Sequence, residues 1–500
     1  MKTKEKVSED ISNIKPSGWI SAFKFTPLLI FALMVIVFKF DLLLAAPIAT
    51  FSALIVYMIV QKANFDKAFE NCLISVRKIV VVFFILMFAY AVAECFMATG
   101  VGAALINLAF ELGVTARSIA PVALIVTCLL SIATGTSWGT FAACAPIFLW
   151  LNHLVGGDIS LTICSIAGGS CFGDNIGMIS DVTVLSCGMQ DVKIIDRLKH
   201  QLIWAFSSLA IALVIVYFAG MGLPSTQGDL AVAISNIPDS ALESLAEQRP
   251  SALVLLEQVK TGVPYYMIIP LIVVILLSFL KLHTMICLVS GMILSLILGL
   301  FAGTTTISVW LNDLLLTGFG DAGSWVIVMM IWVSAFGGIM NSMNAFDPLA
   351  NFIVKISKNV QQLMGWCGVL CLAGNVALAD ETAQVATISP IIRDIVEKNV
   401  ECEDESDIYS LRLRLATFTS AMGIYGSQLI PWHCFPVFFA GIATAVYPLQ
   451  TFSPIDLISQ NYLSFIIIAS LLFLTFTGLD RFIPMLALPS SKRVRLKKHK

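Results

Sequence analysis

The amino-acid sequence predicts an all-α polytopic membrane protein with about 12 membrane segments. Of its 500 residues, 58% are hydrophobic and only 12% are charged, and the mean hydropathy is +0.90. No water-soluble fold needs so much apolar surface. Apolar runs recur at the length of roughly 17–25 residues that a helix needs to cross a bilayer. Because these runs lack the alternating pattern of barrel strands, we expect helices.

The first apolar run follows a polar stretch, and a second run comes almost at once, so we do not expect a cleavable signal.

Most of the 12 cysteines lie inside apolar runs without CxxC spacings, which indicates packing rather than zinc or redox chemistry. The expected spans are residues 24–40, 43–60, 79–98, 115–133, 202–222, 264–281, 284–302, 324–341, 363–379, 414–430, 433–448 and 463–479.

Basic residues are concentrated in a few polar segments. They gather before the first span, in segments 61–78 and 191–200, and in the last ten residues, SKRVRLKKHK, which carry six Lys or Arg. By the positive-inside rule these segments are cytoplasmic, so we expect both termini in the cytoplasm of a multi-pass cell (inner or plasma) membrane protein. A nucleic-acid patch is the alternative for the tail, but a basic tail beside a final span is more often a topology signal.

The polar segment 223–263 divides the chain near its middle. It contains five acidic residues against Arg249 and Lys260, and we expect it outside the cell. The predicted organisation is a cytoplasmic tail (1–20), a first membrane repeat (21–222), an extracytoplasmic connector (223–263), a second membrane repeat (264–485) and a basic cytoplasmic tail (486–500).

An internal repeat appears when the chain is shifted by 244 positions. SIATGTSWGTFAACAP, ending at Pro146, then aligns with NVALADETAQVATISP, ending at Pro390, and residues 89–107 align with 333–351. Two matches at one offset indicate a repeat. The shift also aligns the basic segment 61–78 with a segment that has no Lys or Arg, so equivalent loops are expected on opposite sides. We therefore predict two inverted repeats with broken helices or re-entrant hairpins, an architecture typical of secondary transporters.

In the first repeat, the stretch TGTSWGT (residues 134–140) interrupts an apolar region with two glycines and four hydroxyl residues. We expect the helix to open there. Exposed carbonyls and the hydroxyls of Thr136 and Ser137 are hard oxygen ligands that can replace the hydration shell of Na⁺. The alternative is close helix packing through small residues.

The stretch GGSCFGDNIGMISDVTVLSCG (residues 168–188) places two aspartates among glycines and hydroxyl residues, between apolar flanks. A carboxylate in hydrocarbon is costly, so it normally faces a cavity and has a partner or a function. Because burial and a bound cation shift its pKa in opposite directions, one such group can release a proton as it takes up Na⁺. The alternative is helix capping, above all for Asp174. We predict a Na⁺ ligand in Asp181 and further ion or substrate contacts from Asp174, Asn175, Ser180 and Thr183.

The second repeat places Asp380 and Glu381 at the positions that align with Thr136 and Ser137. Both are candidate site residues, and both reach one cavity only if the backbone is irregular. Further on, GIYGSQLIPWHCFP (residues 423–436) supplies the polar candidates Ser427, Gln428 and His433, with a purely structural role as the alternative.

Glu94 lies inside an apolar run of the first repeat. It is a candidate proton carrier, and the alternative is a side chain that extends to the membrane interface.

The strings GTSWGT and FGDNIGMISDVTVLSC resemble the signature segments of NhaC-type Na⁺/H⁺ antiporters, in which GTSWGT precedes GDxxSPISDTT. The resemblance is specific over residues 135–188 and implies an ion-coupled transporter with inverted repeats and re-entrant hairpins. The positions that match the pattern are Gly173, Asp174, Ile179, Ser180, Asp181 and Thr183.

Three positions depart from that pattern. Gly177 and Met178 replace the usual Ser-Pro pair, and Val182 replaces the first Thr after the aspartate. The missing hydroxyl at Val182 puts an unchanged ion shell in doubt. The resemblance therefore implies ion coupling more securely than it implies the cargo.

Two other classes of protein were weighed. The segment Gly135 to Gly139 formally matches GxSxG, but a serine hydrolase needs that motif between a strand and a helix, with a His and an acid nearby. A channel fits less well than alternating access, because paired broken elements with ionisable residues are typical of transporters. We therefore predict no enzyme activity.

The predicted function is Na⁺/H⁺ antiport by alternating access. The alternative is Na⁺- or H⁺-coupled transport of an amino acid or organic acid. No cofactor is expected beyond Na⁺ and H⁺ as transported or coupling ions. The expected partners are the lipid bilayer, small ions and, in the alternative, a small organic solute, with no nucleic acid; a homodimer is left open.

Overall fold

The structure is a computed structural model that describes residue 20 and residues 23–497 apart from 135–136, 178–179, 227–229, 236, 238, 249, 281, 324 and 344–346. At some positions beside these gaps, Asp181 among them, only the backbone is described. Thr136, a predicted Na⁺ ligand, lies outside the described residues.

Helices account for most of the described chain. Those before the connector are α3 (Thr26–Ala32), the π-helical turn Leu33–Val37, α4 (Leu42–Gln61), α5 (Phe65–Thr99), α6 (Val101–Glu111), α7 (Ile119–Thr134), α8 (Ser137–Val155), α9 (Ile159–Ile176), α10 (Asp181–Gln190) and α11 (Ile194–Ala219). The connector contains α12 (Leu230–Ser235), α13 (Asp239–Gln248) and α14 (Pro250–Thr261).

The part after the connector begins with the 3₁₀ turn Tyr265–Ile268 and ends with a short strand. Its elements are α15 (Ile269–Phe279), α16 (Thr284–Ala302), α17 (Ile307–Val309), the π-helical turn Trp310–Leu315, α18 (Leu316–Gly323), α19 (Trp325–Ser342), α20 (Asp347–Ile356), α21 (Val360–Leu378), α22 (Glu381–Asn399), β1 (Val400–Cys402), α23 (Glu405–Ser427), α24 (Cys434–Val446), α25 (Tyr462–Thr477), the 3₁₀ turn Leu479–Phe482 and β2 (Val494–Leu496).

Six helices of the described residues are long and apolar enough to cross a membrane, or seven if the bent pair in α5 and α6 counts as one span. The two parts of that pair, Phe83–Thr99 and Val101–Glu111, meet at 66° around Gly100, whose φ of 107° favours glycine. Helix α8 is among the six, although the sequence analysis did not assign it a span. The prediction of about 12 segments therefore stays a prediction.

The helix pairs α7–α8 and α21–α22 have the same arrangement. In each pair two residues separate the helices: α7 ends at Thr134 and α8 begins at Ser137, while α21 ends at Leu378 and α22 begins at Glu381. Helices α8 and α22 both contain 19 residues, and their first and last residues are 244 positions apart. The members of each pair pack against each other.

Two further helices are interrupted along their length. Residues 177–180 separate α9 from α10, and residues 428–433 separate α23 from α24. Helix α10 packs against α22 and α23, and α24 packs against α8. Four helix breaks are thus brought into one region. We call residues 134–137 and 176–181 the first breaks, and residues 378–381 and 427–434 the second breaks.

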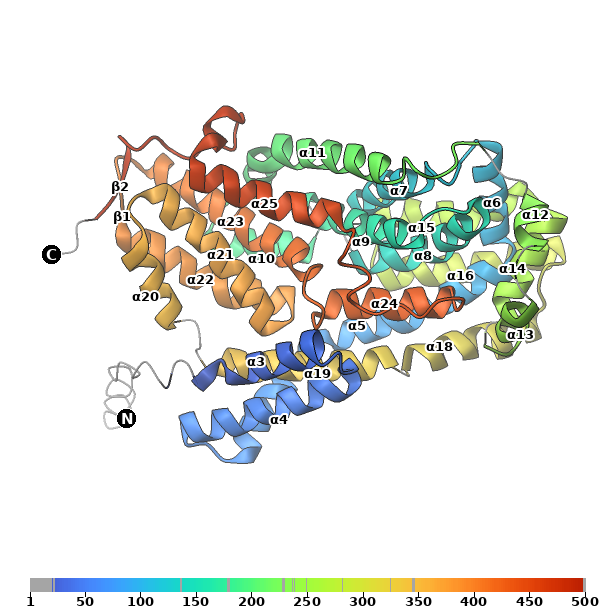
Figure 1. Ribbon diagram of the computed structural model, residues 1–500, viewed down its shortest axis with the longest axis horizontal. Helices are drawn as coiled ribbons and strands as arrows, with labels where there is room; N and C mark the ends of the chain where they lie inside the picture. Colours follow the sequence, from blue (N-terminus) through green and yellow to red (C-terminus); the bar gives the residue numbers. More distant parts are fainter. Residues whose placement is uncertain are drawn as a thin grey trace.

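Most helices run along the long axis of the molecule (Figure 1). Helices α21, α22 and α23 lie toward the end that carries β1 and β2, whereas α7, α8 and α24 lie toward the end formed by connector helices α12–α14 (Figure 1). Strands β1 and β2 pair antiparallel, with Glu401 opposite Arg495. This pairing fastens the end of the chain to the turn between α22 and α23.

Candidate functional site

Glycine packing positions the last turn of α9. A Cβ atom on Gly173 would lie 1.9 Å from the carbonyl carbon of Ser131 in α7, so only glycine allows this approach. The Gly173 N–H donates to Ser131 Oγ at 3.0 Å, and the Ser131 hydroxyl donates to the carbonyl of Ser170. The close contact of α7 and α9 brings the next residue, Asp174, to the start of α8.

The carboxylate of Asp174 joins both first breaks. Its Oδ2 accepts hydrogen bonds from the hydroxyl of Ser137 at 2.6 Å and from the Ser137 N–H at 3.3 Å. Its Oδ1 accepts one from the hydroxyl of Ser180 at 2.5 Å. Ser137 is the first residue of α8, and Ser180 is the N-cap of α10. Because helix N-termini are electropositive, two of them stabilise this buried anion.

A buried arginine holds the two sides of the α9–α10 break together. Arg197 of α11 is fully buried and donates to Thr183 Oγ1 at 2.8 Å and to Asn175 Oδ1 at 3.0 Å. Gln201, one turn later in α11, donates to the Asn175 carbonyl at 2.9 Å. Thr183 in turn donates to the Asp174 carbonyl at 3.2 Å. The end of α9 and the first turn of α10 are therefore linked through α11, with a buried positive charge beside them.

The second breaks have their own caps. Asp380 is the N-cap of α22, and its Oδ1 accepts from the Ala383 N–H at 2.6 Å. Ala379, just before it, has a positive φ of 55°, and its carbonyl accepts from the N–H of Cys434 at 3.2 Å. His433, the N-cap of α24, contacts Asn375 Oδ1 through Nε2 at 2.9 Å. These bonds hold the starts of α22 and α24 side by side.

The first and second breaks lie close to each other inside the molecule. Glu381 lies within electrostatic range of both Asp380 and Asp174, and the Ser420 hydroxyl of α23 donates to Asn175 Oδ1 at 3.1 Å. Next to them, the rings of Trp138 and Phe435 stack with centroids 4.5 Å apart. The contacts between α8 and α24 and between α10 and α22 therefore enclose three carboxyl groups at one site.

Several buried polar atoms at this site have no hydrogen-bond partner among the described residues. They are Glu381 Oε2, the amide nitrogen and oxygen of both Gln384 and Gln428, the Tyr425 hydroxyl, Asn175 Nδ2 and Arg197 Nε. A buried polar group without a partner costs about 1–3 kcal/mol. A concentration of such groups marks this region as the candidate binding site.

The predicted site residues lie in several parts of the structure. Asp174, Asn175, Ser180, Thr183 and Ser137 form one connected network, and Asp380 and Glu381 lie opposite it. Ser427 donates to the Ile424 carbonyl at 2.5 Å, and Gln428 is buried at the C-cap of α23. For Asp181 the structure describes only its place as the first residue of α10, so its ion-binding role stays a prediction. Glu94 is buried in α5, which packs against α8.

The described residues contain no group of three or more His, Cys, Asp or Glu side chains that could hold a metal ion.

Comparison with known proteins identifies the family of this chain. The sequence pattern of the Na⁺/H⁺ antiporter family matches residues 11–176 and 169–479. The chain belongs to the Na⁺/H⁺ antiporter family. Membership makes it a multi-pass membrane transporter and not an enzyme, and it agrees with the NhaC-type resemblance of the signature segments.

Relatives within the family differ in the cargo that their names state. The chain is 23% identical over 382 residues to the malate-2H⁺/Na⁺-lactate antiporter of Bacillus subtilis, covering 71% of this chain and 72% of that protein. It is 21% identical over 335 residues to the Na⁺/H⁺ antiporter NhaC of Alkalihalophilus pseudofirmus, covering 63% and 66%. Family membership thus establishes a secondary transporter and leaves the cargo open.

Sequence reasoning missed several residues that lie at the candidate site. Arg197 was counted with the basic segment 191–200 as a sign of cytoplasmic exposure, yet it is fully buried. Its spacing of four from Gln201 puts both on one helix face, which is the signal that could have identified it. The other missed residues are buried polar residues of α21, α22 and α23 that belong to no recognised motif: Asn375, Gln384, Ser420 and Tyr425.

Proposed function

We propose that this family member exchanges Na⁺ for H⁺ at the facing breaks. The observation that carries the proposal is the Asp174 carboxylate, held between the N-termini of α8 and α10 by Ser137 and Ser180. Such a group can bind Na⁺ with neighbouring oxygens in one state and a proton in the other. Glu381, within electrostatic range of Asp174, is the second candidate for the exchanged proton.

Alternating access is supported by the arrangement of the two helix pairs. Helix α22 leads from its break to β1 at one end of the molecule, while α8 lies toward the opposite end (Figure 1). The common length of α8 and α22 and their offset of 244 residues support two inverted repeats. We infer that α7–α8 and α21–α22 are re-entrant hairpins entering from opposite sides, with both termini cytoplasmic and residues 223–263 outside.

The test is transport by purified protein in proteoliposomes with a pH-sensitive dye inside. An outward Na⁺ gradient should drive Na⁺ out of the lumen and H⁺ into it. The lumen should therefore become acidic, with a fixed ratio of H⁺ to Na⁺. Asp174→Asn keeps the shape of the side chain and removes its charge, so exchange should fall to background. Asp158→Asn is the matched control. Asp158 is the N-cap of α9 and lies away from the breaks, and asparagine preserves the cap. Full exchange by the folded Asp174→Asn protein would contradict the proposal.

A second candidate function is Na⁺-coupled transport of a small carboxylate. Asn175 Nδ2, Arg197 Nε and the amides of Gln384 and Gln428 include hydrogen-bond donors without partners among the described residues. Donors do not ligate a cation, whereas they do bind a carboxylate. The Bacillus relative, named a malate and lactate antiporter, points the same way. Uptake of labelled organic acids and amino acids with and without a Na⁺ gradient distinguishes the two functions.

A further inference from the structure

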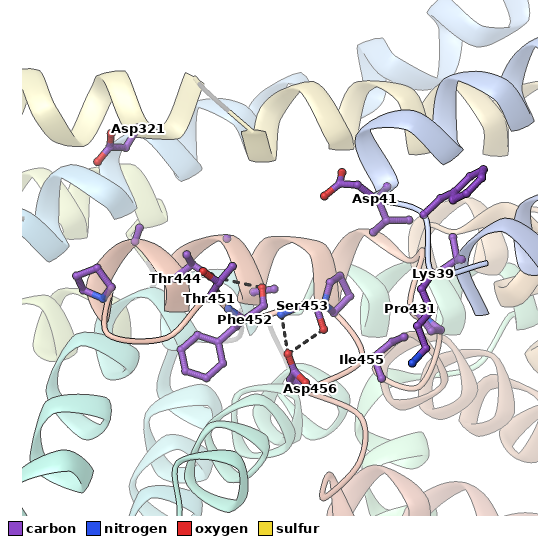
Figure 2. A pocket seen from close by; sticks show the side chains of 18 of the residues that line it. Lys39, Asp41, Asp321, Pro431, Thr444, Thr451, Phe452, Ser453, Ile455 and Asp456 are labelled. Carbon is purple, nitrogen blue, oxygen red and sulfur yellow. Dashed lines mark hydrogen bonds between the residues drawn. The ribbon is translucent and has the colours of Figure 1, made fainter. Parts of the chain in front are cut away.

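A cavity of about 910 Å³ lies away from the carboxylates of the breaks. It is bounded by the turn between the π-helical segment 33–37 and α4, by α24, and by segment 448–456 that follows α24 (Figure 2). Tyr90 of α5 and Asp321 of α18 complete its wall. The cavity therefore lies where helices of the first half meet those of the second.

The cavity wall carries an excess of negative charge. Among its described lining residues are three carboxylates, Asp41, Asp321 and Asp456, and one ammonium group, Lys39. Figure 2 shows the three acids on separate segments around the space. Asp41 accepts from the Leu43 N–H at 2.7 Å, and Asp456 accepts from the Ser453 N–H at 2.7 Å. Two of the acids are thus fixed by backbone bonds.

One wall of the cavity reaches the second breaks. Pro431, which lines the cavity, belongs to the segment between α23 and α24, and the next residue, Trp432, donates to the Val376 carbonyl of α21 at 2.9 Å. The ring of Phe31 packs against Trp432 with centroids 5.7 Å apart and against Phe336 at 5.1 Å. These aromatic rings therefore pack next to the point where the cavity wall, at Pro431, belongs to the second breaks.

We propose that this cavity is the vestibule from which monovalent cations reach the facing breaks, and that Asp41, Asp321 and Asp456 raise their concentration there. A cleft of one charge sign with apolar walls focuses the electric field and enriches the opposite ion by about tenfold or more. The route to the breaks rests on the proposed Na⁺/H⁺ exchange, whereas the negative potential does not. Anionic solutes are repelled from this entrance.

The potential can be measured with a single cysteine. Eleven of the twelve native cysteines are buried, so Cys402→Ser provides a background with little reactivity. Thr451→Cys adds a thiol in the exposed part of the cavity, and Ser225→Cys adds one at an exposed position after α11 as the control. Each is labelled in detergent with a cationic trimethylammonium and an anionic sulfonate methanethiosulfonate.

At low ionic strength the ratio of cationic to anionic labelling rates should be about tenfold higher at Thr451→Cys than at Ser225→Cys. The ratio should fall to the control value when Asp41, Asp321 and Asp456 are all changed to Asn, rise with Lys39→Gln, and fall in high salt because screening removes the difference. Equal ratios at the two positions, or no reaction at Thr451→Cys, would overturn the proposal.

Transport then tests the route. In the triple Asn variant the KM for Na⁺ should rise several-fold at low ionic strength with little change in kcat, and the cationic label on Thr451→Cys should block Na⁺ exchange. A high labelling ratio with unaltered KM and unblocked exchange would overturn the entry role while leaving Na⁺/H⁺ exchange intact. Absence of exchange in the unmodified protein, with the labelling ratio as expected, would instead refute the proposed function alone.

Discussion

At the residue scale, Asp174 is a carboxylate whose burial cost is offset locally. Two hydroxyls and one backbone N–H donate to it, and two helix N-termini add favourable dipoles. A carboxylate at membrane depth without such support would cost several kcal/mol. From the sequence, Asp174 could cap a helix or bind an ion. The structure shows a contact with the start of α8, and ion binding stays a prediction.

The charge of Asp181 remains the most direct residue-level prediction. Asp181 is the first residue of α10 and follows Ser180. We expect Asp181→Asn to fold normally and to lose Na⁺-dependent transport, because the amide cannot hold Na⁺ or carry the proton. Asp181→Glu should keep partial activity with weaker Na⁺ affinity. The measurements are proteoliposome transport and the rise in thermal midpoint on adding Na⁺. Wild-type transport by Asp181→Asn would move the ion site to Asp174 and Asp380.

Arg197 should act by positioning the break rather than by contacting the ion. Arg197→Gln loses the bonds to Thr183 and Asn175, and Asn175 Oδ1 then keeps only the bond from the Ser420 hydroxyl. The free energy of unfolding should therefore fall by roughly 1–3 kcal/mol. Arg197→Lys keeps the charge but cannot bond both residues in one plane, and should recover only part of the stability. Chemical unfolding and the KM for Na⁺ are measured together. If both variants keep the wild-type free energy of unfolding and the wild-type KM for Na⁺, the hydrogen bonds of Arg197 have no positioning role.

At the element scale, the breaks are produced by small residues and by caps. Glycine at 173 and 169 lets α9 approach α7, since a Cβ at Gly169 would lie 2.0 Å from Thr127 Oγ1. Ser180, Asp380 and His433 then cap the helices that restart after three of the four breaks. Local sequence therefore determines where a helix stops, and packing against a neighbour determines where the next one points.

Gly173→Ala tests the close approach of α7 and α9. The added methyl group meets backbone atoms of Ser131 that cannot move aside as a side-chain end could, so the helices must separate. We expect a loss of about 1–3 kcal/mol in the free energy of unfolding, the usual range for overpacking, and reduced transport. Gly188→Ala, whose Cβ would meet nothing within 4 Å, is the control and should be close to wild type in both measurements.

At the scale of the whole molecule, the end of the chain is fastened to the second half. Strand β2 pairs with β1, and Arg493 forms ion pairs with Asp404 and Asp407 at the start of α23. The Ser406 hydroxyl and the Arg493 guanidinium lower the pKa of the Asp404 carboxyl. Because α22, β1 and α23 are consecutive, this attachment can restrain the helix pair α21–α22.

The attachment should weaken in acid. A carboxyl whose pKa is lowered in the folded state stabilises that state above its unfolded pKa of about 3.9, and loses this contribution as pH falls through the folded pKa. Asp404→Asn keeps the cap of α23 and removes the charge. Its tail should be cut faster than the wild-type tail by a trypsin-like protease at pH 7. In acid, with an acid-active protease, the two rates should converge. A difference independent of pH would contradict this account.

The sequence by itself determined the helical membrane class, the family resemblance, and the opening of a helix within residues 134–140. These follow from local properties, namely apolar length, small residues and hydroxyl or acidic residues in apolar runs. Tertiary structure decided that Arg197 is buried, that Asp174 bridges two helix starts, and that Gln384 and Tyr425 belong to the same site. The bonds between Asp174 and Ser137 and between Ser420 and Asn175 join residues 37 and 245 positions apart. Such contacts depend on how helices pack in three dimensions, and no local pattern in a single sequence encodes that.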